Sequence, residues 1–135
     1  MIDGIDHIAI AVNSLEESLE FYQKALGLHL EGIEVVEEQK VRVALLKVGE
    51  SRIELLEPTS EDSPISGFLA KRGPGLHHIA LATTQLQSRL DKLDSDGVRL
   101  IDRKAKIGAE GKQIAFVHPK ASGGVLMELC AEGEE

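Results

Sequence analysis

Alternating apolar and polar residues mark two stretches that lie far apart in the chain but share one pattern. Residues 5–12 read Ile-Asp-His-Ile-Ala-Ile-Ala-Val, and residues 76–80 read Leu-His-His-Ile-Ala. A period of two predicts strands whose successive side chains point to opposite faces. His7 then shares its face with Ala9 and Ala11, so small side chains leave space beside the imidazole.

A helical period follows the first strand. Ser14 is expected as the N-cap, with Glu17 completing a capping box and Gly27 supplying a left-handed C-cap. The expected buried stripe consists of Leu15, Leu19, Tyr22 and Leu26. We expect strands next, over residues 33–37, 41–48 and 51–57, with a hairpin turn at Gly49.

The same order of elements then repeats. Residues 58–75 are rich in Pro and Gly and read as a connection with a short helix near residues 65–69. A strand is expected over residues 76–83, then a helix capped by Thr84 and ended by Gly97. Further strands are expected near residues 98–103, 112–118 and 124–130. Thr84 lies 70 positions after Ser14, and Gly97 lies 70 after Gly27, which indicates a duplication.

The pattern therefore predicts an α+β fold of two tandem βαβββ modules. We expect residues 5–58 and 76–132 to be the repeats, joined by residues 59–75 within a single domain of 135 residues. One such module buries too little apolar surface to be stable alone, so the two are expected to share their concave faces.

Each predicted module begins with a histidine strand and ends with a glutamate strand. His7 and His78 lie 71 positions apart, and Glu54 and Glu128 lie 74 apart. The repeat favours His78 over His77, which points to the opposite face of its strand. Two imidazoles and two carboxylates form a plausible shell for a divalent metal, and this mixed shell favours cobalt, manganese, nickel or zinc over calcium.

Structural roles for the same residues remain open at this stage. A lone histidine on a strand is more often a structural residue than a metal ligand, and Glu54 alone would fit the solvent face of an antiparallel sheet. Glu128 lies in the apolar stretch 125–130, so its carboxylate requires a partner. Cys130 is expected to be a small buried residue.

Composition narrows the range of partners. The formal net charge of −8 argues against nucleic acid as a ligand. The single cysteine permits no intrachain disulfide, which fits a cytoplasmic location. We expect no secretory signal, because the first residues show no basic region followed by an apolar stretch. We expect no membrane span, because no apolar run approaches about 20 residues. A local basic cluster consists of Arg103, Lys104, Lys106, Lys112 and Lys120.

The paired modules with histidine and glutamate on their outer strands resemble the vicinal oxygen chelate superfamily and, within it, the methylmalonyl-CoA epimerase family. The segments that carry the resemblance are Ile5–Ala9, Asp62–Lys71, Gly75–Ala80, Phe116–Lys120 and Gly124–Leu129. The resemblance covers residues 5–132. It implies an incomplete barrel around a divalent metal held by His7, Glu54, His78 and Glu128, although some epimerases carry Gln at the position of Glu54.

The resemblance also implies an activity and its partners. The expected reaction interconverts (2R)- and (2S)-methylmalonyl-CoA, within propionate metabolism, by a homodimer. The metal would stabilise the enediolate formed when the C2 proton leaves, and Glu128 is expected as one acid/base group. The second such group is left open, because Val43 stands where some members carry a glutamate. Lys112 and Lys120 are expected to bind the phosphates of the acyl-CoA thioester.

Two other functions stay open on the sequence alone. A lyase of the glyoxalase I type would use a similar shell on glutathione hemithioacetals, but the segment Phe116–Lys120 favours the epimerase. A metal-free small-molecule-binding protein of the same fold would be expected to lack the four ligand residues. An extradiol dioxygenase would require only three ligands and iron, and usually a longer chain.

Overall fold

The computed structural model describes residues 2–132. The chain forms two compact units: residues 7–77, here the N-terminal unit, and residues up to Asp6 together with those from His78 onward, here the C-terminal unit. Each unit contains the expected order of one strand, one helix and three strands. Within residues 2–132, no helix combines the length and apolar character that crossing a membrane requires.

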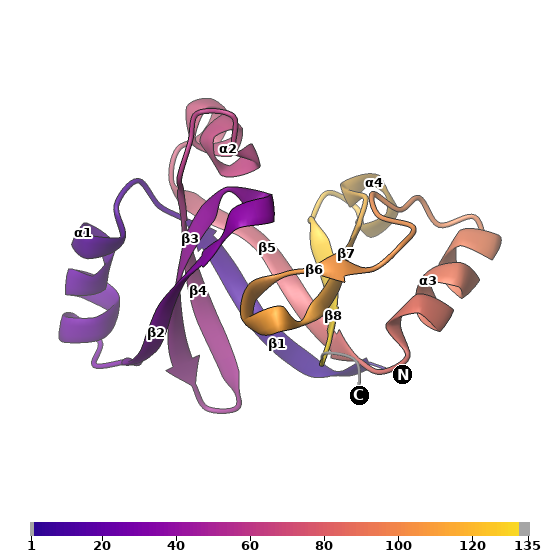
Figure 1. Cartoon of the computed structure of the whole chain (residues 1–135), viewed down its shortest axis with the longest axis horizontal. Coiled ribbons are helices and arrows are strands. Elements are labelled where there is room, and N and C mark those ends of the chain that lie inside the picture. Colours follow the sequence, from indigo (N-terminus) through magenta and orange to yellow (C-terminus); the bar gives the residue numbers. More distant parts are fainter. Residues whose placement is uncertain (1, 133–135) are drawn as a thin grey trace. The chain divides into compact units, whose positions relative to one another are not determined.

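Strands β1 (Ile2–Ala11), β2 (His29–Val36), β3 (Val41–Val48) and β4 (Ser51–Pro58) supply the sheet of the N-terminal unit, in the order β2-β3-β4-β1 (Figure 1). β1 runs parallel to β4, and the other two pairs are antiparallel. The three expected strands after the helix are confirmed, although the first of them begins earlier, at His29.

The helix of the N-terminal unit begins as expected but continues differently. The Ser14 hydroxyl accepts the Glu17 N–H at 3.2 Å, which starts α1 (Leu15–Leu19). The chain then widens into a π-helix, η1 (Glu20–Ala25). The expectation that Leu26 is buried is wrong: it is 53% exposed. Its N–H reaches back five residues to Phe21, and the wider turn rotates Leu26 off the buried face.

A hydrophobic layer fixes α1 on the sheet of the same unit. Leu15, the first helical residue, is fully buried. Its cluster also contains Val12, Ala44, Leu46 and Leu55, with Leu19 and Tyr22 packed against it. A short 3-10 helix, η2 (Glu37–Gln39), connects β2 to β3. The connection from β4 to the next strand contains the expected short helix α2 (Pro64–Arg72), which the Ser63 hydroxyl caps by accepting the Ile65 N–H.

The C-terminal unit repeats the plan with shorter strands. Its elements are β5 (Gly75–Thr83), α3 (Leu86–Ser95), β6 (Lys106–Ile107), η3 (Ala109–Gly111), β7 (Gln113–Val117), α4 (Pro119–Ser122) and β8 (Met127–Ala131). The strand order is β5-β8-β7-β6, and β5 runs parallel to β8 (Figure 1). Cys130 on β8 is buried, as expected.

Two expectations for this unit are wrong. Residues 98–103 form no strand; in the described chain they contribute one isolated bridge, from Leu100 to Val117. The Asp102 carboxylate accepts a hydrogen bond from the Phe116 N–H at 2.9 Å. This side-chain bond replaces part of a backbone ladder. Thr84 is not the cap of α3: the N-cap is Gln85, which has a left-handed backbone (φ 54°) and makes no side-chain capping bond.

The corrected cap strengthens the repeat. Gln85 lies 71 positions after Ser14, and this is the same spacing that separates His7 from His78. Gly27 and Gly97 both adopt positive φ after their helices, as expected. The strand and the start of the helix therefore recur in one common register.

Candidate metal centre

The N-terminal unit buries an imidazole beside a carboxylate. His7 lies on β1 and Glu54 on β4, and the parallel register sets Glu54 opposite Ala9. The His7 Nδ1 and Glu54 Oε2 atoms are 3.3 Å apart, and each residue is 5% exposed. Glu54 therefore does not face solvent. Ala9 is fully buried, and it carries only a methyl group on the face that it shares with His7.

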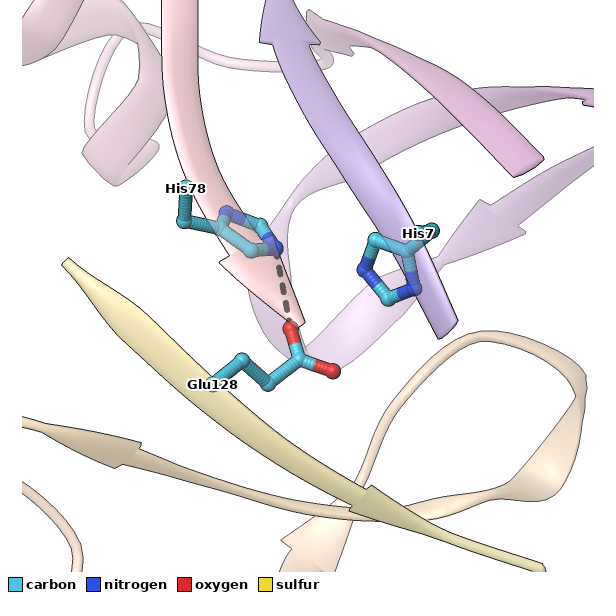
Figure 2. Close-up of side chains that lie close together, drawn as sticks. All are labelled: His7, His78 and Glu128. Atoms are coloured by element: carbon cyan, nitrogen blue, oxygen red, sulfur yellow. Dashed lines mark ion pairs between the residues drawn. The ribbon is translucent and has the colours of Figure 1, made fainter. Parts of the chain in front are cut away.

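The C-terminal unit builds the same arrangement. His78 lies on β5 and Glu128 on β8, with Glu128 opposite Ala80 in the parallel register. The dashed line in Figure 2 marks their ion pair, in which His78 Nε2 and Glu128 Oε1 are 2.9 Å apart. Both residues are buried. In each unit, one alanine pairs with the glutamate across the two strands. The histidine lies two positions before that alanine.

The burial and the atom types of these pairs fit a metal. A carboxylate taken out of water is costly unless an opposite charge or a hydrogen bond compensates it. Each pair places a nitrogen donor next to an oxygen donor, and His7, also drawn in Figure 2, extends from β1. Mixed imidazole and carboxylate donors are typical ligands of divalent transition metals and zinc.

Two supporting residues had no role assigned from the sequence. Phe116 on β7 meets the His78 ring edge-on, with the ring centroids 5.2 Å apart. Arg52 on β4 places its Nη1 atom 3.9 Å from Glu54 Oε2. Alternation along β4 already sets Arg52 on the face of Glu54, so this signal was present in the sequence. The contact of Phe116 depends on β7 pairing with β8, which brings Phe116 opposite Glu128.

Acidic neighbours accompany much of the basic cluster. The Lys112 ammonium is 3.0 Å from Asp6, and its side chain is 11% exposed. Arg103 is paired with Asp94, and Lys106 with Asp102. These ion pairs reduce the positive charge that the cluster offers to an anion. Binding of CoA phosphates by Lys112 remains a prediction.

Lys120 lies in the first turn of α4. The His118 Nδ1 atom accepts the Lys120 N–H at 3.0 Å and caps this short helix. Desolvation of the imidazole lowers the pKa of His118, and the charges of Arg99 and Lys120 lower it further. His118 therefore has a structural role as the cap of α4. Contact of the Lys120 side chain with CoA remains a prediction.

Val43 is almost fully buried in β3, and its hydrocarbon side chain cannot transfer a proton. A cavity of about 750 Å³ in the C-terminal unit lies elsewhere. Its lining comes from the start of β1, the end of β5, the start of α3, the start of β7 and the end of β8, and it includes neither His78 nor Glu128.

Comparison with known proteins identifies the family. The model of the glyoxalase/bleomycin resistance protein/dioxygenase superfamily matches residues 6–116. The chain belongs to this superfamily, and its paired βαβββ plan is the vicinal oxygen chelate fold. The expected fold class is confirmed.

Individual relatives cover nearly the whole chain. An uncharacterized protein of Bacillus subtilis, YqjC, is 48% identical to this chain. The aligned region spans 96% of this chain and 92% of YqjC. The ethylmalonyl-CoA/methylmalonyl-CoA epimerase of Cereibacter sphaeroides is 37% identical and covers 96% and 98%. A solved methylmalonyl-CoA epimerase in complex with methylmalonyl-CoA and NH4+ is 40% identical, covers 98% and 96%, and has a TM-score of 0.93.

Proposed function

We propose that the protein is a methylmalonyl-CoA epimerase, which interconverts the (2R) and (2S) forms of its acyl-CoA substrate. The observation that carries this proposal is the repeated, buried imidazole–carboxylate pair, His7 with Glu54 and His78 with Glu128. The similarity to epimerases, including one in complex with methylmalonyl-CoA, supports the choice of substrate.

The four side chains of the two pairs hold one divalent ion in this proposal. Their donor set suits cobalt, manganese, nickel or zinc. Such an ion supplies a Lewis acid for the negative charge that develops when the C2 proton leaves the substrate. The carboxylates of Glu54 and Glu128 together balance a double positive charge, so a loaded site would be close to neutral.

Glu128 is the proposed acid/base group. Inversion at C2 requires that a proton leaves one face of a planar intermediate and returns to the other. A glutamate oxygen adjacent to the reacting carbon can accept and return this proton, and the edge of Phe116 helps to hold the partner His78 in place. The second acid/base group is not assigned, since Val43 cannot transfer a proton.

The proposal extends to the partners of the chain. The substrate is an acyl-CoA with a free carboxylate on its acyl group, and Lys112 and Lys120 are proposed to contact its CoA moiety. A cytoplasmic homodimer is proposed as the working form. Sedimentation equilibrium tests the dimer directly, because a monomer of 14.6 kDa and its dimer differ twofold in mass.

Exchange of the C2 proton tests the proposed reaction. Methylmalonyl-CoA is incubated in deuterated water with metal-loaded or chelator-treated protein, and proton NMR follows the C2 signal. We expect fast exchange that depends on the metal. Absence of exchange above background with metal bound would contradict the epimerase, and turnover of a glutathione hemithioacetal in a parallel assay would support a glyoxalase-type lyase instead.

A further inference from the structure

A β-bulge lies next to the N-terminal half of the proposed metal centre. The register of β2 against β3 shifts between Leu30 and Gly32, so Glu31 is the extra residue. Bulges commonly redirect a side chain beside a functional site. Here the Glu31 carboxylate is directed at Arg52 on β4, with Oε1 3.2 Å from Nε.

Arg52 connects this carboxylate to the histidine pair. Its Nη1 atom lies 3.9 Å from Glu54 Oε2, the same oxygen that is 3.3 Å from His7 Nδ1. The Arg52 side chain is 20% exposed, and that of Glu54 is 7% exposed. A continuous series of charged and polar groups therefore runs from Glu31 through the guanidinium to Glu54 and His7.

The fold itself does not require an arginine at this position. The spacing of 74 residues that relates Glu54 to Glu128 sets Leu126 at the position of Arg52 in the second module. β8 nevertheless pairs with β5 in the same parallel register as β4 with β1. The guanidinium is thus an addition to one half of the centre, and its charge is opposite to that of Glu54.

We propose that Arg52 is a positioning residue for Glu54. It compensates the carboxylate in the metal-free protein and holds Oε2 beside His7, while Glu31 fixes the guanidinium from the other side. A bound cation takes over part of this compensation, so the protein depends on Arg52 most when the metal is absent. The inference rests on the proposed function insofar as Glu54 binds the ion.

Thermal unfolding of Arg52→Met tests this dependence, with and without saturating Co²⁺. We expect the Tm of the metal-free variant to fall by about 5 °C or more relative to wild type, because removal of one partner leaves Glu54 less compensated. With Co²⁺ bound, the fall should be less than half as large. Arg52→Lys, which keeps the charge, should restore most of the metal-free Tm.

Arg42→Met provides the matched control in the same unit. Arg42 also bridges two carboxylates, those of Glu16 and Glu57 at 2.9 and 2.8 Å, and neither is a proposed ligand. Its loss should lower the Tm equally with and without Co²⁺. Equal losses for Arg52→Met in the two forms would overturn the positioning role and leave Arg52 as a purely structural residue.

A second measurement does not depend on the metal. Long-range proton–nitrogen NMR of the metal-free protein should show that Arg52→Met shifts the imidazole nitrogens of His7 and leaves those of His78 unchanged. Unchanged His7 signals would overturn the proposal. If wild-type protein shows no Tm rise with Co²⁺ while the His7 signals do shift, the proposed metal function fails and the positioning of Glu54 by Arg52 stands.

Discussion

The two units bury equivalent pairs of residues but support them in different ways. In both, a histidine on the first strand meets a glutamate on the last strand, in the same parallel register. In the N-terminal unit a guanidinium accompanies the carboxylate. In the C-terminal unit an aromatic ring accompanies the imidazole. The shared register is what the duplication preserves, whereas the supporting contacts have diverged.

The surrounding elements differ in the same way. The hairpin of β2 and β3 pairs along nearly its full length, while the corresponding β6 contributes only two residues. The helix of the N-terminal unit has a serine cap, whereas α3 begins at a left-handed Gln85. The strand pair that carries the histidine and the glutamate is therefore the element that the two units share. Each unit stabilises this pair with its own contacts.

The largest expected effect is on the rate of C2 proton exchange, and it compares the glutamates of the two units. Glu128→Gln should reduce C2 exchange by about 1,000-fold, because an amide cannot accept the proton. Glu54→Gln keeps an oxygen donor and should cost about tenfold or less. Exchange rates at saturating metal and substrate measure both, with metal content checked for each variant. Equal losses would mean that the two halves do not differ in catalytic role.

The next effect compares the two hydrophobic layers. Leu15 in α1 and Leu90 in α3 are both fully buried. Leu15→Ala should cost about 4 kcal/mol of the free energy of unfolding, within the range for buried leucines. Leu90→Ala should cost about 3 kcal/mol, because a groove of about 540 Å³ beside α3 lets the neighbouring side chains relax.

Urea unfolding of the leucine variants gives these free energies, provided that the m-value is unchanged. Leu26→Ala is the control, since Leu26 is exposed on the π-turn and its loss should have little effect. A larger loss for Leu90→Ala than for Leu15→Ala would show that the layer of the C-terminal unit is the better packed of the two.

A smaller effect distinguishes the two helix starts. Ser14→Ala should cost about 1 kcal/mol through loss of the cap on Glu17. Gln85→Gly should stabilise the fold by about 0.5 kcal/mol, because glycine adopts φ 54° without strain. Thr84→Ala serves as the control and should be nearly neutral. A cost of about 1 kcal/mol for Thr84→Ala would restore Thr84 as the cap.

The smallest effect depends on pH and concerns α4. Desolvation lowers the pKa of His118 from its ordinary value of 6.5, so the folded protein favours the neutral imidazole, which accepts the Lys120 N–H. The associated stability is fully present above pH 6.5 and is lost as the pH falls through the lowered pKa. NMR titration should place the pKa of His118 below 6.5 and show loss of the Lys120 amide bond on protonation.

His118→Asn separates the cap from the titration. Asparagine is a good N-cap with no charge change in this pH range. The variant should keep α4 and lose its pH dependence, in the same way that the Ser14 cap is independent of pH. Persistent pH dependence of the Lys120 amide in this variant would show that another group controls this helix.

The sequence by itself determined the plan of the fold and the residues of the proposed centre. Alternation placed His7 on a face with small alanines, and the spacing of His78 and Glu128 from their counterparts revealed the duplication. These signals can be read from the sequence, because strand alternation and the spacing of repeats depend only on the order of the residues. The apolar stretch 125–130 around Glu128 also indicated that its carboxylate would need a partner.

Tertiary structure decided the features that depend on pairing across the chain. The π-turn that exposes Leu26 and the bulge that directs Glu31 at Arg52 are each local irregularities in an otherwise regular element. The side-chain bond of Asp102 replaces part of a backbone ladder. Residue periodicity cannot resolve such features, because each is set by competition between hydrogen bonds of similar energy. The ion pair of Lys112 with Asp6 likewise joins residues that lie 106 positions apart.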